Sequence, residues 1–176
     1  MTTTKHAVAS SLIKAVRIGN HGGSEQLKYE EAPLPRLDPN HVLAKVRHAG
    51  VNPVDWKIRE GYMKKVFPAS FPLTLGHDFA GEIVNAGGDS RRFSTGERVF
   101  GFGDGAYAEF TEAAISDIAT IPEKIDFAVA AALPKTGPAE ALLKLVGKKA
   151  AAQAFNRASA LGLTTVLGQR LKALPS

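Results

Sequence analysis

The sequence predicts a mainly β fold, a barrel or sandwich of short strands, for the chain up to about Pro134. Apolar stretches there are short and are separated at close intervals by turn-forming residues. In one stretch Val42, Ala44 and Val46 occupy alternate positions, the period of a strand with one inner face. From residue 137 onward apolar residues recur at helical spacing instead, so we expect a helical tail after the β-rich part.

Strands are expected at short apolar stretches along the first 121 residues. In the central stretch we place His48 in the same inward row as Val42 and Leu43 on the outer face, by strict alternation. The residue pairs 22–23, 39–40 and 87–88 and the segment 103–105 are expected to supply turns. In order, the expected strands cover residues 12–18, 27–32, 42–48, 79–84, 97–102, 107–111 and 118–121.

Two short helices are expected within the β-rich part. The first covers residues 53–60, because Asn52 suits the N-cap, Pro53 the first helical position and Gly61 the left-handed stop. Asp55 follows three residues after the cap, where an acidic side chain favours a helix start. A second helix is expected from Asp126 to just before Pro134.

Composition excludes several classes of protein. The 176 residues contain no cysteine, which excludes disulfides, thiolate nucleophiles and cysteine-based zinc or iron–sulfur sites. Residues 1–136 hold 16 Lys and Arg against 16 Asp and Glu, so the net charge of +5 comes from the last 40 residues, and no nucleic-acid partner is expected. No apolar run is long enough for a transmembrane segment, and a cytoplasmic location is predicted.

One glycine-rich segment matches a nucleotide-binding pattern. Residues 101–106 fit G-x-G-x-x-G/A, which binds a pyrophosphate only where a helix N-terminus follows. Here residues 107–111 alternate like a strand, so the segment is interpreted as a glycine-rich hairpin.

Five side chains stand out as candidate pocket residues, each with a structural alternative. His77 and Asp78 could form an acid–base pair in a polar pocket or belong to a metal site, or His77 could be hydrogen-bonded at a strand edge. Trp56 and Tyr62 could stack on a flat ligand or pack into the core. Asn52 could cap the helix or face a cleft. The residues alone leave these alternatives open.

Several ordered motifs make the chain resemble a known family over about three-quarters of its length. It resembles the N-terminal, GroES-like domain of the medium-chain dehydrogenase/reductase superfamily, in the zinc-free quinone oxidoreductase branch. The matching segments are KAVR at 14–17, AGVNPVDWKIREG at 49–61, FPLTLGHDFAG at 71–81, GERVFG at 96–101, GAYAEF at 105–110 and AAALP at 130–134.

The resemblance implies a fold and an activity. The expected fold is a GroES-like, partly open β-barrel over residues 12–136, after a flexible extension at 1–11. The implied reaction is hydride transfer from NADPH to a quinone or activated enone without metal, because Asn52 stands where zinc-dependent relatives have a cysteine and Asp78 follows His77. Asn52, Trp56, Tyr62 and Thr136 would line one wall of the cleft; no catalytic residue is assigned.

The chain departs from the family pattern after Pro134. Relatives continue through a linking helix into a Rossmann domain, whereas residues 137–176 form an expected truncated linking helix and a basic, alanine-rich tail. A βαβ unit alone needs about 30 residues, so a Rossmann domain is expected to be absent and the chain inactive unless a nucleotide-binding domain is supplied in trans. The alternative is a non-enzymatic GroES-like binding module whose basic helical tail engages an acidic partner or a membrane surface.

Overall fold

The computed structural model describes residues 12–87 and 92–134, and these residues form mainly strands. The predictions for residues 1–11, Thr136 and the tail at 137–176 lie outside this part. The smaller of two antiparallel sheets has the order β2-β1-β4, and the larger has the order β7-β3-β5-β6-β8. The strands are β1 (Leu12–Ile18), β2 (Lys28–Pro33), β3 (His41–Ala49), β4 (Leu73–Thr74), β5 (Asp78–Ala86), β6 (Arg98–Phe102), β7 (Phe110–Ala114) and β8 (Ile118–Thr120).

A segment between the sheets joins them into the partly open barrel that was predicted. The amide of Val16 in β1 donates to the Tyr107 carbonyl at 2.7 Å, and the amide of Val46 in β3 donates to the Glu109 carbonyl at 2.9 Å. Residues 107–109 thus contact both sheets, and the regular strand β7 begins only at Phe110. The expected strand at 107–111 was therefore wrong in its bounds, because its first half bridges two sheets instead of continuing one.

Two irregularities in β3 overturn the strict alternation expected there. The register between β3 and β5 shifts between Leu43 and Ala44 and again between Val46 and His48. Each bulge rotates the following side chain toward the other face of the sheet. The second shift directly precedes His48, which is exposed instead of inward. Leu43 precedes both shifts and is buried because β3 is covered on both faces there, as the burial of Val42, Leu43 and Ala44 shows.

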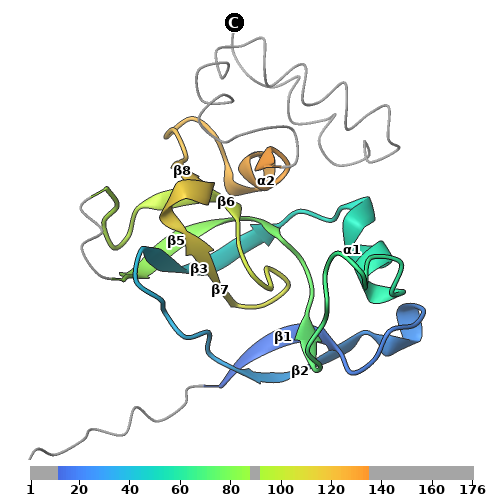
Figure 1. The fold of residues 1–176 in the computed structure, drawn as a ribbon. Helices are drawn as coiled ribbons and strands as arrows, with labels where there is room; N and C mark the ends of the chain where they lie inside the picture. The colour runs from blue at the N-terminus through green and yellow to red at the C-terminus, as the bar shows by residue number, and fades with distance from the viewer. Residues whose placement is uncertain (1–11, 88–91, 135–176) are drawn as a thin grey trace, which may run out of the picture.

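One cluster of the core lies between the larger sheet and the helix α2 (Phe127–Ala131), and a second lies within the larger sheet around Phe79 and Val99. In Figure 1 this helix covers one side of the larger sheet, while β1 and β2 lie toward the opposite end of the molecule. Apolar residues of β5, β6 and β8 pack against it; the buried members are Ala80, Phe100, Ala119, Ile121, Ala130, Ala131 and Leu133. The Asp126 side chain accepts a hydrogen bond from the Val129 amide at 2.8 Å, which confirms the predicted start of this helix.

The other predicted helix, α1 (Pro53–Arg59), also forms, and it is anchored at both ends. At its C-terminal end the Gly22 amide donates to the Arg59 carbonyl at 3.0 Å, and His21 Nδ1 lies 3.0 Å from the Ile58 carbonyl oxygen. Gly61 follows with a φ of 82°, the left-handed conformation that its position after the helix predicted. No helix among residues 12–87 and 92–134 has the length and apolar character to span a membrane.

Candidate functional site

A buried carboxylate in the first turn of α1 organises the candidate site. The Asp55 side chain accepts hydrogen bonds at Oδ2 from the Asn52 backbone amide at 2.6 Å and from the Tyr107 hydroxyl at 2.9 Å. Its other oxygen, Oδ1, lies 3.6 Å from His77 Nδ1 in an ion pair. Asp55 is only 4% exposed, so these contacts replace water around its charge. The carboxylate therefore connects α1 to the segments at residues 77 and 107.

A second buried carboxylate extends the cluster. Asp78, at the start of β5, accepts a hydrogen bond at Oδ2 from the Asn52 side-chain amide at 2.8 Å. Its own carbonyl accepts from the Gly50 amide at 2.8 Å, which fixes the end of β3 against β5. Asn52 thus occupies the N-cap position of α1 while its side chain contacts Asp78. The structure brings together three sequence-predicted residues, Asn52, His77 and Asp78.

The pKa values of the cluster reflect opposing effects of burial and contact. Burial alone would raise the pKa of Asp55, but His77, the Asn52 amide and the Tyr107 hydroxyl together lower it below 3.8. Contact with Asp55 raises the pKa of His77 above 6.5 despite partial burial, and the charges of Asp104 and Asp78 add to this effect. Burial, followed by the charge of Asp55, raises the pKa of Tyr107. His77 is thus favoured as a cation and Tyr107 as a neutral hydroxyl.

These shifts predict a pH dependence of stability. Because the pKa of Asp55 is lowered, its charge stabilises the fold fully above pH 3.8. This contribution is lost as the pH falls through the pKa that Asp55 has in the folded protein. Because the pKa of His77 is raised, its charge contributes fully to stability below pH 6.5. This contribution is lost as the pH rises through the pKa that His77 has in the folded protein. Urea unfolding should therefore give a lower free energy of unfolding at pH 8.5 than at pH 6. The decrease should be smaller in His77→Gln; an equal decrease in both proteins would contradict the role of the pair.

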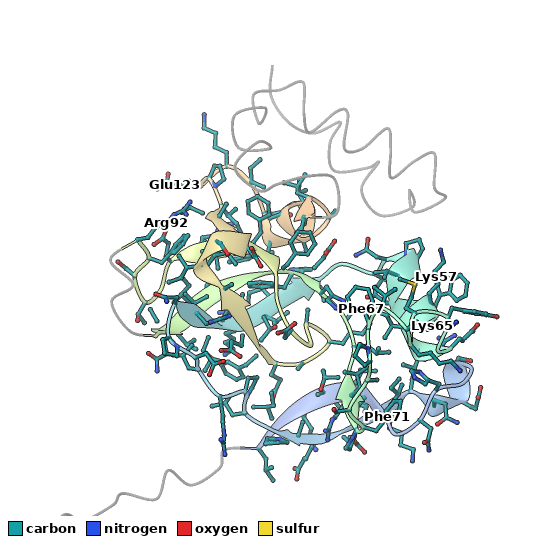
Figure 2. The ribbon with its side chains drawn as sticks, in the orientation of Figure 1. Lys57, Lys65, Phe67, Phe71, Arg92 and Glu123 are labelled. Atoms are coloured by element: carbon teal, nitrogen blue, oxygen red, sulfur yellow. The ribbon has the colours of Figure 1, made fainter. Side chains whose placement is uncertain are left out.

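A cavity of about 440 Å³ opens beside His77, between α1 and the segment 66–75. Its walls are mainly apolar, and polar groups lie in its lining at His77, Thr74 and Asp104. The Phe67 and His77 ring centroids are 6.4 Å apart, with the rings tilted by 54°. In Figure 2, Phe67 lies on the side of α1 that faces the sheets, whereas Lys57 and Lys65 lie farther out. The other lining residues are Ile58, Val66, Pro68, Ala69, Leu73, Leu75 and Gly105.

The two aromatic residues predicted for the cleft wall lie elsewhere on α1 and just beyond it. Trp56 is 42% exposed and Tyr62 70% exposed, so neither is a core residue. Their ring centroids are 5.8 Å apart in an edge-to-face contact, and Lys57 Nζ lies 5.8 Å from the Trp56 ring centroid. Neither ring lines the cavity. The structure therefore places an exposed aromatic face and a separate apolar cavity around the same helix.

The glycine-rich segment at 101–106 is followed by no helix, as predicted, but it is not the predicted hairpin. The strand before it, β6, pairs with β5 and β8, whereas the strand after it, β7, pairs with β3. The amide of Gly103 donates to the His77 carbonyl at 2.8 Å, that of Asp104 to the Glu112 carbonyl at 2.9 Å, and that of Ala106 to the Gly76 carbonyl at 2.9 Å. Amides that already donate to backbone carbonyls cannot cradle a phosphate. This segment therefore positions His77 and one wall of the cavity.

Side chains that could bind a metal ion do not cluster in the part of the chain that the structure describes. Within residues 12–87 and 92–134, no three His, Cys, Asp or Glu side chains are arranged to hold a metal ion. The Asn52 side-chain nitrogen, a hydrogen-bond donor, faces the Asp78 carboxylate. The prediction of a zinc-free site stays a prediction.

Sequence reasoning missed two members of the site. Asp55 was interpreted only as a helix-start residue, and Tyr107 only as part of a strand. Asp55 and Tyr107 are 52 residues apart in the sequence, and no local sequence pattern indicates the hydrogen bond between them. The available signal was the combination of an acidic residue in the first turn of a helix with a tyrosine directly after a glycine turn.

Comparisons with known proteins agree with this geometry. Residues 38–123 match the family model of the alcohol dehydrogenase GroES-like domain. The chain is 39% identical over 133 residues to human quinone oxidoreductase, covering 72% of this chain and 39% of that protein. It is 33% identical over 157 residues to the chloroplast envelope quinone oxidoreductase homolog of Arabidopsis thaliana, covering 81% of this chain and 48% of that one.

Solved structures give the same result. The quinone oxidoreductase of Coxiella burnetii has a TM-score of 0.64 at 31% identity, over 85% of this chain and 46% of that one. The Escherichia coli quinone oxidoreductase complexed with NADPH has a TM-score of 0.61 at 29% identity, over 68% of this chain and 36% of that one. The chain thus spans less than half the length of these relatives. It contains an alcohol dehydrogenase GroES-like domain and belongs to the quinone oxidoreductase branch of the medium-chain dehydrogenase/reductase superfamily.

Proposed function

We propose that this chain is the catalytic-domain portion of an NADPH-dependent oxidoreductase that reduces a quinone or an activated enone. The observation that carries the proposal is an apolar cavity of about 440 Å³ beside a buried polar cluster, which suits a flat, mainly apolar acceptor. Relatives whose names describe quinone oxidoreductases support it, one of them solved with NADPH. The catalytic domain is assigned to residues 12–136, as the sequence predicted.

The described residues fit one side of a cofactor cleft. NADPH, when bound, supplies the hydride. Trp56 and Tyr62 offer exposed aromatic rings that can contact the cofactor outside the cavity, near Asn52 at the start of α1. The amides of Gly103, Asp104 and Ala106 in the glycine-rich segment already donate to backbone carbonyls, so the segment gives no diphosphate cradle. The proposal therefore assigns the diphosphate and ribose contacts to a nucleotide-binding domain outside the described residues.

The chain's own residues would position the acceptor and exclude water. Ile58 and Phe67 contribute apolar surface to the cavity, so a bound ring system would displace water from it. Asp55 holds His77 at the polar end of this cavity. These residues would orient the acceptor, since fixed orientation lowers the barrier of hydride transfer.

The full 176-residue chain is expected to bind NADPH in the millimolar range or more weakly, because one wall of a cleft leaves most polar groups of the cofactor without partners. It should show no NADPH oxidation with a panel of naphthoquinones and enones. Fluorescence titration and absorbance assays measure both quantities. Micromolar binding, or turnover that Asn52→Ala abolishes, would show that the chain is a complete enzyme.

A chimaera tests the activity itself. Residues 12–134 would replace the corresponding domain of the Escherichia coli quinone oxidoreductase, whose own nucleotide-binding part is kept. The proposal predicts NADPH-dependent reduction of at least one quinone or enone of the panel. A chimaera that binds NADPH as tightly as the parent enzyme but reduces none of these acceptors would contradict the proposal.

A further inference from the structure

We propose that the cavity between α1 and residues 66–75 is the acceptor site, and that His77 makes it selective for an uncharged carbonyl compound by donating a hydrogen bond from Nε2 to the carbonyl oxygen. This inference rests on the proposed function, because it specifies where and how the acceptor binds. It differs from the sequence-based assignment, which placed the cleft wall at Asn52, Trp56, Tyr62 and Thr136.

The cavity has the size and lining of a small-molecule site. A volume of about 440 Å³ lies within the range of about 300–1,000 Å³ that is usual for such sites. Its apolar lining comes from α1 through Ile58, from the loop at 66–69 and from Leu73 and Leu75. The Phe67 ring, which is still 45% exposed, offers a flat surface to a planar ligand.

His77 is oriented to present one nitrogen to a ligand. Its Nδ1 lies 3.6 Å from Asp55 Oδ1, so this nitrogen faces the buried carboxylate. The ring itself lines the cavity, and 37% of the side chain is exposed. Nε2 is the nitrogen that remains for an incoming oxygen. Asp55 is in turn fixed by the Asn52 amide and the Tyr107 hydroxyl, so the imidazole is held before a ligand arrives.

The charges around the cavity favour a neutral ligand over an anion. His77 is the single cationic side chain in the cavity lining, and the carboxylate of Asp104 belongs to the same lining. Asp55 contacts His77, and the charge of Asp78 also acts on it. Three carboxylates around one imidazole leave the polar end negative overall. A carboxylate or sulfonate would therefore be repelled where a ketone oxygen can accept a hydrogen bond.

Binding measurements on the full chain test this site without NADPH. The probes are menadione, an uncharged naphthoquinone, and 1,4-naphthoquinone-2-sulfonate, which has the same ring system with an anionic group. Equilibrium dialysis should give a Kd for menadione at least tenfold lower than that for the sulfonate. Ala69→Trp should weaken menadione binding at least tenfold by occupying the cavity, because Ala69 lines it.

Substitution of the histidine separates the hydrogen bond from the shape of the site. His77→Leu should weaken menadione binding at least tenfold, and His77→Gln should restore part of it, because glutamine keeps a donor. The matched control is His48→Gln, which changes an exposed histidine of β3 that is absent from the cavity lining and should leave the Kd unchanged. Near-ultraviolet circular dichroism confirms that each variant is folded.

The outcomes separate this inference from the proposed function. Menadione binding that is unaffected by Ala69→Trp and His77→Leu, or a chain that binds no menadione, would overturn the site assignment, whereas the activity of the chimaera tests the proposed function independently. Equal affinity for menadione and the sulfonate would overturn the selectivity for neutral ligands.

Discussion

Phe79→Ala is expected to lower the free energy of unfolding by about 3–5 kcal/mol, the usual cost of removing a buried aromatic ring. Phe79 in β5 is 0% exposed and packs in the core of the larger sheet with apolar residues from its neighbouring strands. The interior is closely packed, so the surrounding side chains would fill only part of the cavity left by the ring. Urea unfolding of the full chain at pH 6 measures the change.

Val84→Ala provides the control within the same strand. Val84 is 37% exposed, so its truncation removes little buried surface and should cost less than about 1 kcal/mol. Both variants keep the backbone of β5 and change only an apolar side chain. A similar loss of stability in the two variants would show that Phe79 is not a central core residue.

Asp55→Ala is expected to lower the free energy of unfolding by about 2–4 kcal/mol, because each donor that loses its acceptor inside a fold costs about 1–3 kcal/mol. The change leaves three groups without their acceptor: the Asn52 amide, the Tyr107 hydroxyl and the Nδ1 side of His77. Unsatisfied polar groups inside a fold carry a desolvation cost that water normally offsets. Urea unfolding at pH 6, where both members of the pair are charged, gives the expected decrease.

Asp126→Ala separates this network effect from simple helix capping. Asp126 caps α2 through one hydrogen bond to the Val129 amide and is exposed, so its replacement should cost about 1 kcal/mol. Both residues lie at the start of short helices. If the two substitutions cost the same, Asp55 acts only at the start of α1, and the wider network does not contribute to stability.

Local patterns were sufficient to predict the class of fold and both helices. Asn52, Pro53 and Gly61 define the limits of α1 through backbone conformations that depend on a few neighbouring residues. The absence of a helix after residues 101–106 was also predicted correctly, because it is a local property, whereas the expected hairpin was wrong, because β6 and β7 pair with other strands. The correctly predicted features need no knowledge of distant contacts.

The positions of side chains in β3 could not be predicted in the same way. His48 is exposed because a bulge interrupts the pairing of β3 with β5 just before it, whereas Leu43 is buried because β3 is covered on both faces at that position. A bulge depends on how two strands align, and the residues of one strand alone do not specify it. Strict alternation therefore predicted the strand correctly and two of its side chains incorrectly.

The candidate site was predicted in part for a related reason. Asn52, His77 and Asp78 were selected by residue type and family motif, and the structure brings them together. The cavity instead depends on how the segment 66–75 packs beside α1, which leaves no periodic signal. Trp56 and Tyr62 were selected as flat aromatic residues, but helix geometry places them away from its lining.

The anchoring of α1 has a consequence for the order of folding. The helix has seven residues, fewer than the roughly 12 that an isolated helix needs to be even marginally stable. Its stability therefore depends on contacts such as that between Asp55 and Tyr107, which can form only after a loop of more than 50 residues has closed. We expect α1 to consolidate after the transition state, with φ-values near zero, so substitutions in it would accelerate unfolding and leave the folding rate almost unchanged.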